Sequence, residues 1–219
     1  MQMINVITID GPSASGKGAL ARNIAHQFGL NILDSGVLYR LFAYFDILNV
    51  SYEEIASKID NEINFKLEKD ILKILFQDKD ISFELRSEEI AKVASKLSSK
   101  KEVRDLLYDI QRNFYNSNGL VADGRDMGTV VFKDAKLKIF LTASSKVRAK
   151  RRYLELQNRG QEVNMPSLIA DIESRDLKDS SRKLSPLLPA DDANIIDSSD
   201  MSLEEVFSFT ESLIKKEFI

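Results

Sequence analysis

Short runs of apolar residues alternate along the chain with longer segments of helical periodicity. Five of these runs predict buried strands, at residues 5–10, 31–34, 120–123, 137–143 and 194–197. The last three are almost entirely apolar, which is typical of strands that are covered on both faces of a parallel sheet. Because helices are predicted between most of the runs, the pattern indicates an α/β fold with a parallel five-stranded sheet and helices on both faces.

Apolar residues recur at the spacing of a helix face in several of the intervening segments. One such face spans residues 20–28 and ends at Gly29, and a second spans residues 103–114. A further helix is predicted from Ser145 to about Asn158. The sequence Ser202–Glu205 reads Ser-Leu-Glu-Glu, a capping box that opens a last helix.

Residues 64–83 show a different pattern, in which apolar and polar positions are interleaved. This pattern predicts short antiparallel strands, with turns near Glu68–Asp70 and Gln77–Asp80. We therefore expect a small insertion that lies outside the parallel sheet.

Composition limits the classes to which the protein can belong. Its 219 residues are 43% hydrophobic and 30% charged, as in a globular domain with a sizeable core. Cysteine is absent, which excludes disulfides, thiolate metal sites and thiol nucleophiles and fits a reducing cytosol. The N-terminus lacks a signal-peptide pattern, and no apolar run approaches the roughly 20 residues of a membrane span. We expect a cytoplasmic protein without a membrane partner and, since its net charge is −3, without a nucleic-acid partner.

A glycine-rich loop joins the first predicted strand to the first predicted helix. Residues Gly11–Lys17 read Gly-Pro-Ser-Ala-Ser-Gly-Lys, which matches the core of the Walker A pattern in its required context. Backbone N–H groups of such a loop and the positive end of the helix point at phosphates. Lys17 adds a mobile positive charge that can follow a transferred phosphoryl group. A chance glycine-rich turn would rarely combine strand, loop, lysine and helix in this order, so the sequence predicts a site for nucleotide phosphates.

The residue after Lys17 is Gly18, where the general pattern has a Ser or Thr that coordinates Mg²⁺. Direct side-chain coordination of the metal is therefore not expected there. The Asn-Lys-x-Asp and Asp-x-x-Gly motifs of GTPases are also absent. A Gly-Lys-Gly ending resembles the nucleoside monophosphate kinases, although many of them carry Thr where Ala19 stands here.

Positively charged residues follow the predicted strands, at the sheet edge where ligands of open α/β sheets bind. Two phosphorylated substrates that meet in line repel each other, and arginines are suited to offsetting that repulsion. The relevant segments are Asp34–Arg40, Asp123–Thr129, Arg148–Arg152 and, at near-helical spacing, Arg175, Asp179 and Arg182. The single histidine, His26, is expected to face solvent.

Three segments in this order closely resemble the bacterial-type cytidylate kinases, and the resemblance covers essentially the whole chain. They are Ile9–Ser13, Leu33–Gly36 with Tyr39 and Arg40, and Ala122–Phe132. The resemblance implies transfer of the γ-phosphate of ATP to CMP or dCMP in pyrimidine nucleotide metabolism, with Mg²⁺ as cofactor and these nucleotides as partners. It also implies one P-loop kinase domain at 1–219, with a core at 1–39 and 100–219, a monophosphate-binding insertion at about 40–99 and a lid at about 150–166. The small size suggests a monomer.

The resemblance further implies a role for individual positions. The ATP phosphates would be held by Gly11, Pro12, Ser13, Ala14, Ser15, Gly16, Lys17, Gly18 and Ala19. Residues acting directly in catalysis would be Lys17, Arg125, Arg148 and Arg152. The CMP site would comprise Ser35, Tyr39, Arg40, Ser95, Arg104, Asp123, Arg125, Asp126, Arg175, Asp179 and Arg182. Ser95, Arg104 and Asp126 would lie near the cytosine edge, whose amine donor and ring acceptors suit a carboxylate and an arginine.

Asp123 is expected to orient Mg²⁺-bound water without a direct side-chain bond to the metal. Lys178 and Ser180 are less arginine-rich than the family pattern.

Several of these positions have simpler interpretations. Ser95 could lie on an exposed helix surface, and Arg104 could face solvent. The basic residues at 148–152 could form a solvated helix face or a nucleic-acid patch, although no aromatic residues are interleaved with them. Asp179 could pair with Arg175 one helical turn earlier. At the level of function, the alternatives are a kinase for UMP or AMP and a nucleotide-binding switch.

Overall fold

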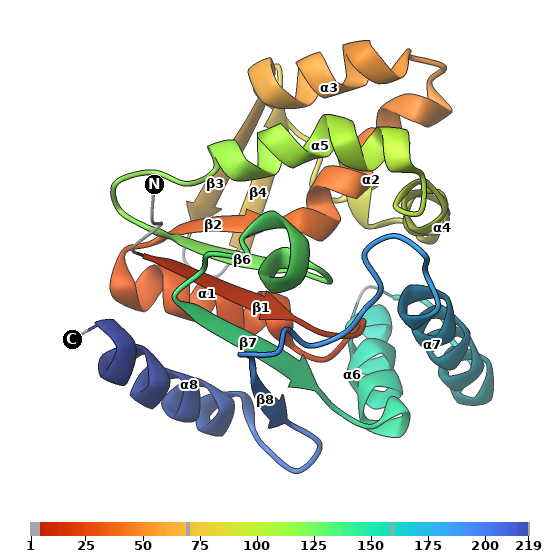
Figure 1. Cartoon of the computed structure of the whole chain (residues 1–219). Helices are drawn as coiled ribbons and strands as arrows, with labels where there is room; N and C mark the ends of the chain where they lie inside the picture. Colours follow the sequence, from red (N-terminus) through yellow and green to blue (C-terminus); the bar gives the residue numbers. More distant parts are fainter. Residues whose placement is uncertain (1–4, 69–70, 159, 219) are drawn as a thin grey trace.

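The computed structural model of the chain describes residues 5–68, 71–158 and 160–218 (Figure 1). Within these residues, a five-stranded sheet has the order β2-β6-β1-β7-β8, and its paired strands are parallel. The strands are β1 (Val6–Asp10), β2 (Asn31–Asp34), β6 (Leu120–Gly124), β7 (Leu137–Thr142) and β8 (Asn194–Asp197). The predicted α/β fold and the five predicted strands are confirmed, because each strand is found within a residue of its expected ends.

Helices cover both faces of this sheet. Alternate residues of β1 belong to two different apolar clusters: Val6 packs with α2 and α5, whereas Ile7 packs with α1 and α8. Neighbouring strand residues point to opposite faces, so the two clusters lie on opposite sides of the sheet. The helices are α1 (Lys17–Phe28), α2 (Ser35–Ile47), α3 (Tyr52–Asn61), α4 (Glu88–Leu97), α5 (Lys101–Asn113), α6 (Ser145–Gln157), α7 (Met165–Ser180) and α8 (Leu203–Phe218).

The predicted helix boundaries are confirmed where local signals specified them. Gly29 adopts a left-handed conformation at the end of α1, and Ser202 and Glu205 exchange both hydrogen bonds of the capping box before α8. His26 is exposed, as expected. By contrast, α2 was not predicted as a separate helix. Its apolar residues extend around most of its circumference because α3 and α4 pack against it, so it lacks a clear two-sided pattern.

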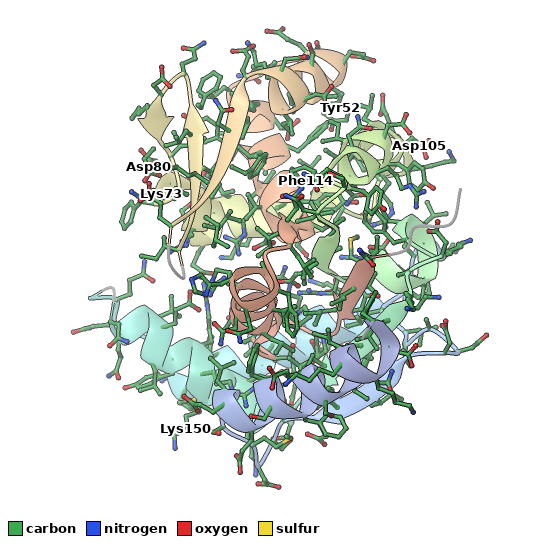
Figure 2. All side chains as sticks on the ribbon, turned by 90° about the vertical axis from the view of Figure 1, so that its left-hand side faces the viewer. Tyr52, Lys73, Asp80, Asp105, Phe114 and Lys150 are labelled. Atoms are coloured by element: carbon green, nitrogen blue, oxygen red, sulfur yellow. The ribbon has the colours of Figure 1, made fainter. Side chains whose placement is uncertain are left out.

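The insertion contains a separate antiparallel sheet of β3 (Ile63–Glu68), β4 (Ile71–Phe76) and β5 (Lys79–Asp80). Figure 2 shows Lys73 and Asp80 on this part of the molecule, well away from Lys150 on α6. The antiparallel insertion is confirmed. The first predicted turn falls partly outside the described residues.

The second predicted turn is shorter than expected. Phe76 pairs with Lys79, so only Gln77 and Asp78 form the turn, both with positive φ. Lys79 and Asp80 belong to β5 instead. The extended pattern also ends early: Ile81 and Phe83 lie beyond the strand, and Phe83 is 82% exposed. Among the described helices, none combines the length and apolar character needed to cross a membrane.

Candidate functional site

A cavity of about 320 Å³ lies at the carboxyl ends of the central strands and is lined in part by residues of α4, α6 and α7. It brings together most of the predicted site residues. Those that line it are Ser13, Ala14, Lys17, Ser35, Tyr39, Arg40, Ser95, Arg104, Asp123, Arg125, Asp126, Arg152, Arg175, Asp179 and Arg182. Those that do not are Gly11, Pro12, Ser15, Gly16, Gly18, Ala19 and Arg148.

The glycine-rich loop wraps around the ammonium group of Lys17. This side chain is only 5% exposed, and its Nζ donates a hydrogen bond of 2.7 Å to the carbonyl of Pro12. Gly11 is required because a Cβ there would lie 2.0 Å from the carbonyl oxygen of Leu141. Gly16 caps α1 with a φ of 99°, a conformation that favours glycine. The conformation of the loop is thus fixed by its own contacts.

Two arginines of α6 fix the loop from outside. Arg148 donates to the carbonyl of Ser13 at 3.2 Å, and also to the carbonyl of Ala143 and to Asp176 on α7. Arg151 donates to the carbonyls of Ser15, at 2.9 Å, and Ser198, at 2.8 Å. Arg151 was absent from the predicted site. The only hint in the sequence was its place one turn after Arg148.

Asp10, also absent from the prediction, ties β1 to the loop after β6. Its carboxylate accepts hydrogen bonds from the backbone N–H groups of Met127, at 2.8 Å, and Gly128, at 2.7 Å. Burial raises its pKa to about 6, although these two bonds oppose the rise. The sequence did contain a signal for Asp10: it is a charged residue at the end of a strand that is otherwise uncharged and buried.

Lys17 and Asp123 are buried near the loop, where their opposite charges attract each other. Burial lowers the pKa of Lys17 and raises that of Asp123, whereas their mutual attraction acts in the opposite direction on each. Gly18 lies beside this pair: a Cβ there would be 3.1 Å from Arg22 Nη1 and 3.3 Å from Asp123 Oδ2. The missing Ser or Thr therefore leaves room for two charged groups.

On the opposite side of the cavity, Asp179 organises two arginines. It is 1% exposed and pairs with Arg125 at 3.2 Å and with Arg182 at 2.5 Å. The simpler interpretation that Asp179 pairs with Arg175 is therefore not what the contacts show. Arg175 Nε is buried without a hydrogen-bond partner, and burial followed by the charge of Arg125 lowers the pKa of Arg175 to about 10. This charge is incompletely compensated, which favours an anionic ligand.

A third group connects α5 with the loop after β6. Arg104 pairs with Asp126 and donates to the carbonyl of Ser98 at 2.9 Å. Its side chain is 12% exposed, so the solvent-facing interpretation is wrong. Burial raises the pKa of Asp126, which is 3% exposed. Ser95 is half-buried and lines the cavity, which also contradicts an exposed position.

The remaining predicted residues form hydrogen bonds and ion pairs with several different elements around the cavity. Ser35 accepts a hydrogen bond from Gln111 at 2.9 Å, and Arg40 donates to the carbonyl of Leu85 at 2.9 Å. Arg152 pairs with Glu88 of α4 and with Glu155. The basic residues of α6 are therefore not one solvated face. Only Lys150 among 148, 150, 151 and 152 is exposed, and Figure 2 shows it at the outer edge of the molecule.

Comparisons with known proteins agree with this geometry. The family model described as cytidylate kinase matches residues 7–216. A cytidylate kinase of Photobacterium profundum is 44% identical over 222 residues, covering 96% of each chain. One from Cupriavidus necator is 44% identical over 211 residues, covering 94% of this chain and 93% of the other.

A solved structure of an uncharacterized protein from Eubacterium ventriosum has a TM-score of 0.51 at 11% identity, covering 96% of this chain and 98% of that one, and supports the fold alone. The family match spans almost the entire chain, including the loop around Lys17 and the cavity residues from Ser35 to Arg182. The chain belongs to the cytidylate kinase family.

Proposed function

We propose that this protein transfers the γ-phosphoryl group of ATP to CMP and dCMP, giving ADP with CDP or dCDP. The observation that carries this proposal is the division of one cavity into a phosphate loop around Lys17 and a separate set of arginines held by Asp179. A phosphate loop alone would accept a nucleotide. The second cationic set supplies a place for a second phosphorylated substrate, as the names of the family relatives imply.

On the donor side, the segment Gly11–Ala19 would bind the ATP phosphates through its backbone N–H groups, which every residue of the segment except Pro12 can supply. Lys17 would follow the γ-phosphoryl group and stabilise the charge that develops during transfer. Mg²⁺ bound with ATP would neutralise part of the phosphate charge, and Asp123 would hold it through water. The described residues contain no group of three or more His, Cys, Asp or Glu side chains placed for a metal ion.

On the acceptor side, Arg40, Arg125, Arg175 and Arg182 would hold the phosphate of CMP. Its oxygen is already anionic, so transfer needs no general base and depends on position and charge. The Asp179 carboxylate orients two of these arginines. It would also accept a hydrogen bond from a sugar hydroxyl.

Specificity for cytosine would come from Ser95, Arg104 and Asp126, with Tyr39 close to Arg104. The Arg104 guanidinium lies 5.9 Å from the centre of the Tyr39 ring. A carboxylate can accept from the exocyclic amine of cytosine, and an arginine can donate to its ring nitrogen and carbonyl. The purine ring of AMP presents a different edge to this set.

The proposed catalytic roles of Arg148 and Arg152 require a rearrangement. The hydrogen bonds of Arg148 currently go to two carbonyls and Asp176, and Arg152 is paired with two glutamates. We infer that closure of the lid at about 150–166 over the core and the insertion exchanges some of these contacts for nucleotide phosphates. We also propose that the protein is a monomer and acts in the cytoplasm.

A coupled assay of ADP release tests this function directly. The protein, ATP and Mg²⁺ are combined with CMP, dCMP, UMP or AMP, and turnover is compared at several acceptor concentrations. We expect rapid turnover with CMP and dCMP and little with AMP. Turnover with AMP alone would retain phosphoryl transfer but reject the cytosine contacts. ATP binding without turnover on any acceptor would instead favour a nucleotide-binding switch.

A further inference from the structure

A second cavity of about 250 Å³ adjoins the main one. The two share the side chains of Asp34, Arg40, Arg152 and Glu155. The rest of the second cavity is lined by residues of α1, α2, β4 and the segment Ser82–Arg86, which do not line the main cavity. It is therefore a distinct cavity that is separated from the main one by these four shared side chains. The proposed reaction gives it no role.

Positive charge predominates in this second cavity. Its lining contains Arg22, Arg40, Arg86 and Arg152, but its only carboxylates among the described residues are Asp34 and Glu155. Glu155 pairs with Arg152. The Asp34 side chain accepts from the backbone N–H of Val37 at 3.1 Å and caps α2. Within the described part of the chain, the other three arginines form no ion pair.

The hydrogen-bonding capacity of these three arginines is also largely unused. Arg22 Nε is buried and has no partner. Arg40 donates to the carbonyl of Leu85, and burial lowers the pKa of its guanidinium. Arg86 is exposed, and its electrostatic neighbour Asp80 already accepts a hydrogen bond from the backbone N–H of Ser82. Arg22 and Arg40 are half-buried, and half-buried cations with unused donors are stabilised by an anion that bonds to several of them. The exposed Arg86 would add a third donor at the rim.

The residues that line the cavity indicate which kind of anion would bind there. Guanidinium groups match the oxygens of phosphate in paired hydrogen bonds. None of the described residues that line this cavity is aromatic, and the apolar ones are Val37, Leu72, Ile74 and Leu85. A nucleotide base would therefore gain no stacking on these residues. We propose that the cavity is a second anion site that binds free inorganic phosphate between Arg22, Arg40 and Arg86.

Phosphate in this site would affect ligand binding in the main cavity through the side chains that line both cavities. Arg40 lines both spaces, and an ion on one side draws its guanidinium away from the other. Bound phosphate would therefore weaken the binding of CMP. This coupling, unlike the anion site itself, rests on the proposed role of Arg40 at the acceptor phosphate.

The decisive experiment is a calorimetric titration of inorganic phosphate into the full chain with CMP saturating and ionic strength constant. We expect a phosphate-binding event that persists when CMP fills the main cavity. Arg22→Gln and Arg86→Gln should each weaken it about tenfold, as expected for the loss of a charge-assisted hydrogen bond. The matched control is Lys92→Gln, which removes an exposed positive charge on α4 outside both cavities and should have no effect. Melting curves of each variant verify folding.

A kinetic measurement provides a second readout. Phosphate should raise the KM for CMP, and Arg86→Gln should relieve that inhibition without changing kcat in phosphate-free buffer. Because the two sites are coupled, saturating CMP should weaken phosphate binding by the same factor by which phosphate weakens the binding of CMP. Phosphate binding that neither substitution weakens would place the ion in the main cavity and overturn the proposal. Failure of CMP itself to bind would overturn the proposed function instead. Titration without CMP would then still show whether Arg22 and Arg86 hold phosphate.

Discussion

The two ends of the main cavity are constructed in opposite ways. The donor end is one continuous segment, Gly11–Ala19, which comprises the loop and the first turn of α1 and whose backbone groups are the proposed phosphate ligands. Its conformation is fixed by hydrogen bonds from Lys17, Arg148 and Arg151 to carbonyls of the loop itself. The acceptor end consists of side chains from α2, α4, α5, α7 and the loop after β6, which are brought together only by folding.

Because of this difference, we expect substitutions at the two ends to affect different properties of the enzyme. At the donor end, one lysine, Lys17, is proposed to supply the mobile charge. At the acceptor end, charge is distributed over paired groups such as Arg125 with Asp179 and Arg104 with Asp126. We expect changes at the donor end to affect the chemical step most, and changes at the acceptor end to affect mainly the choice and affinity of substrate.

The largest effect is expected from Lys17→Ala. The substitution removes the charge that stabilises the transferred phosphoryl group, so kcat should fall by about 10³-fold. Steady-state kinetics with ATP and CMP measures it. Lys150→Ala, which removes an exposed lysine of α6, is the matched control. Near-normal kcat in the Lys17 variant would refute the donor assignment.

The next effect concerns Asp10 and the pH dependence of stability. The folded state raises the pKa of this carboxyl from 3.8 to about 6, so the folded protein holds its proton more tightly than the unfolded chain. Its contribution to stability is therefore complete below about pH 4 and is lost as pH rises to about 6, by roughly 3 kcal/mol. Urea unfolding at several pH values should show this loss in the native protein but not in Asp10→Asn. Parallel stability curves would contradict the expectation.

Arg104→Met tests whether the acceptor end selects the base. We expect the KM for CMP to rise about 10- to 100-fold, with little change in the KM for ATP, because one charge-assisted contact is lost. The variant also leaves buried Asp126 without its partner and should be less stable. Adding Asp126→Asn should restore stability but not CMP affinity. Recovery of both would show that Arg104 acts through folding alone.

The smallest effect is expected for Arg151→Met. It removes hydrogen bonds to the carbonyls of Ser15 and Ser198, so the loop should lose some of its fixed geometry. The KM for ATP should rise about tenfold, which corresponds to about 1.4 kcal/mol, while the KM for CMP stays constant. Arg112→Met is the control, since Arg112 also donates to a carbonyl, that of Val131, but lies outside the main cavity. Equal changes in both KM values would assign Arg151 a general structural role.

Sequence patterns predicted the elements whose signals are local. The five strands and the antiparallel insertion were found where expected. The same patterns extended the insertion strands too far. Ile81 is apolar and buried, as a strand residue would be, but the last strand of the insertion ends at Asp80. They also missed α2. Other helices cover several sides of α2, so its sequence lacks the polar face that marks an amphipathic helix. The division into core, insertion and lid stays a prediction.

The sequence by itself determined the phosphate loop, since Gly11, Gly16 and Lys17 act through backbone conformation and charge within one short segment. Only the tertiary structure decided which charged groups meet. It paired Asp179 with Arg125 and Arg182 rather than Arg175, and Asp10 with backbone N–H groups that lie more than 100 positions away. Apart from Arg182, which is three positions after Asp179, these partners are far apart along the chain. They are selected by burial, because a buried charge must find whichever donor or acceptor the packed elements place beside it.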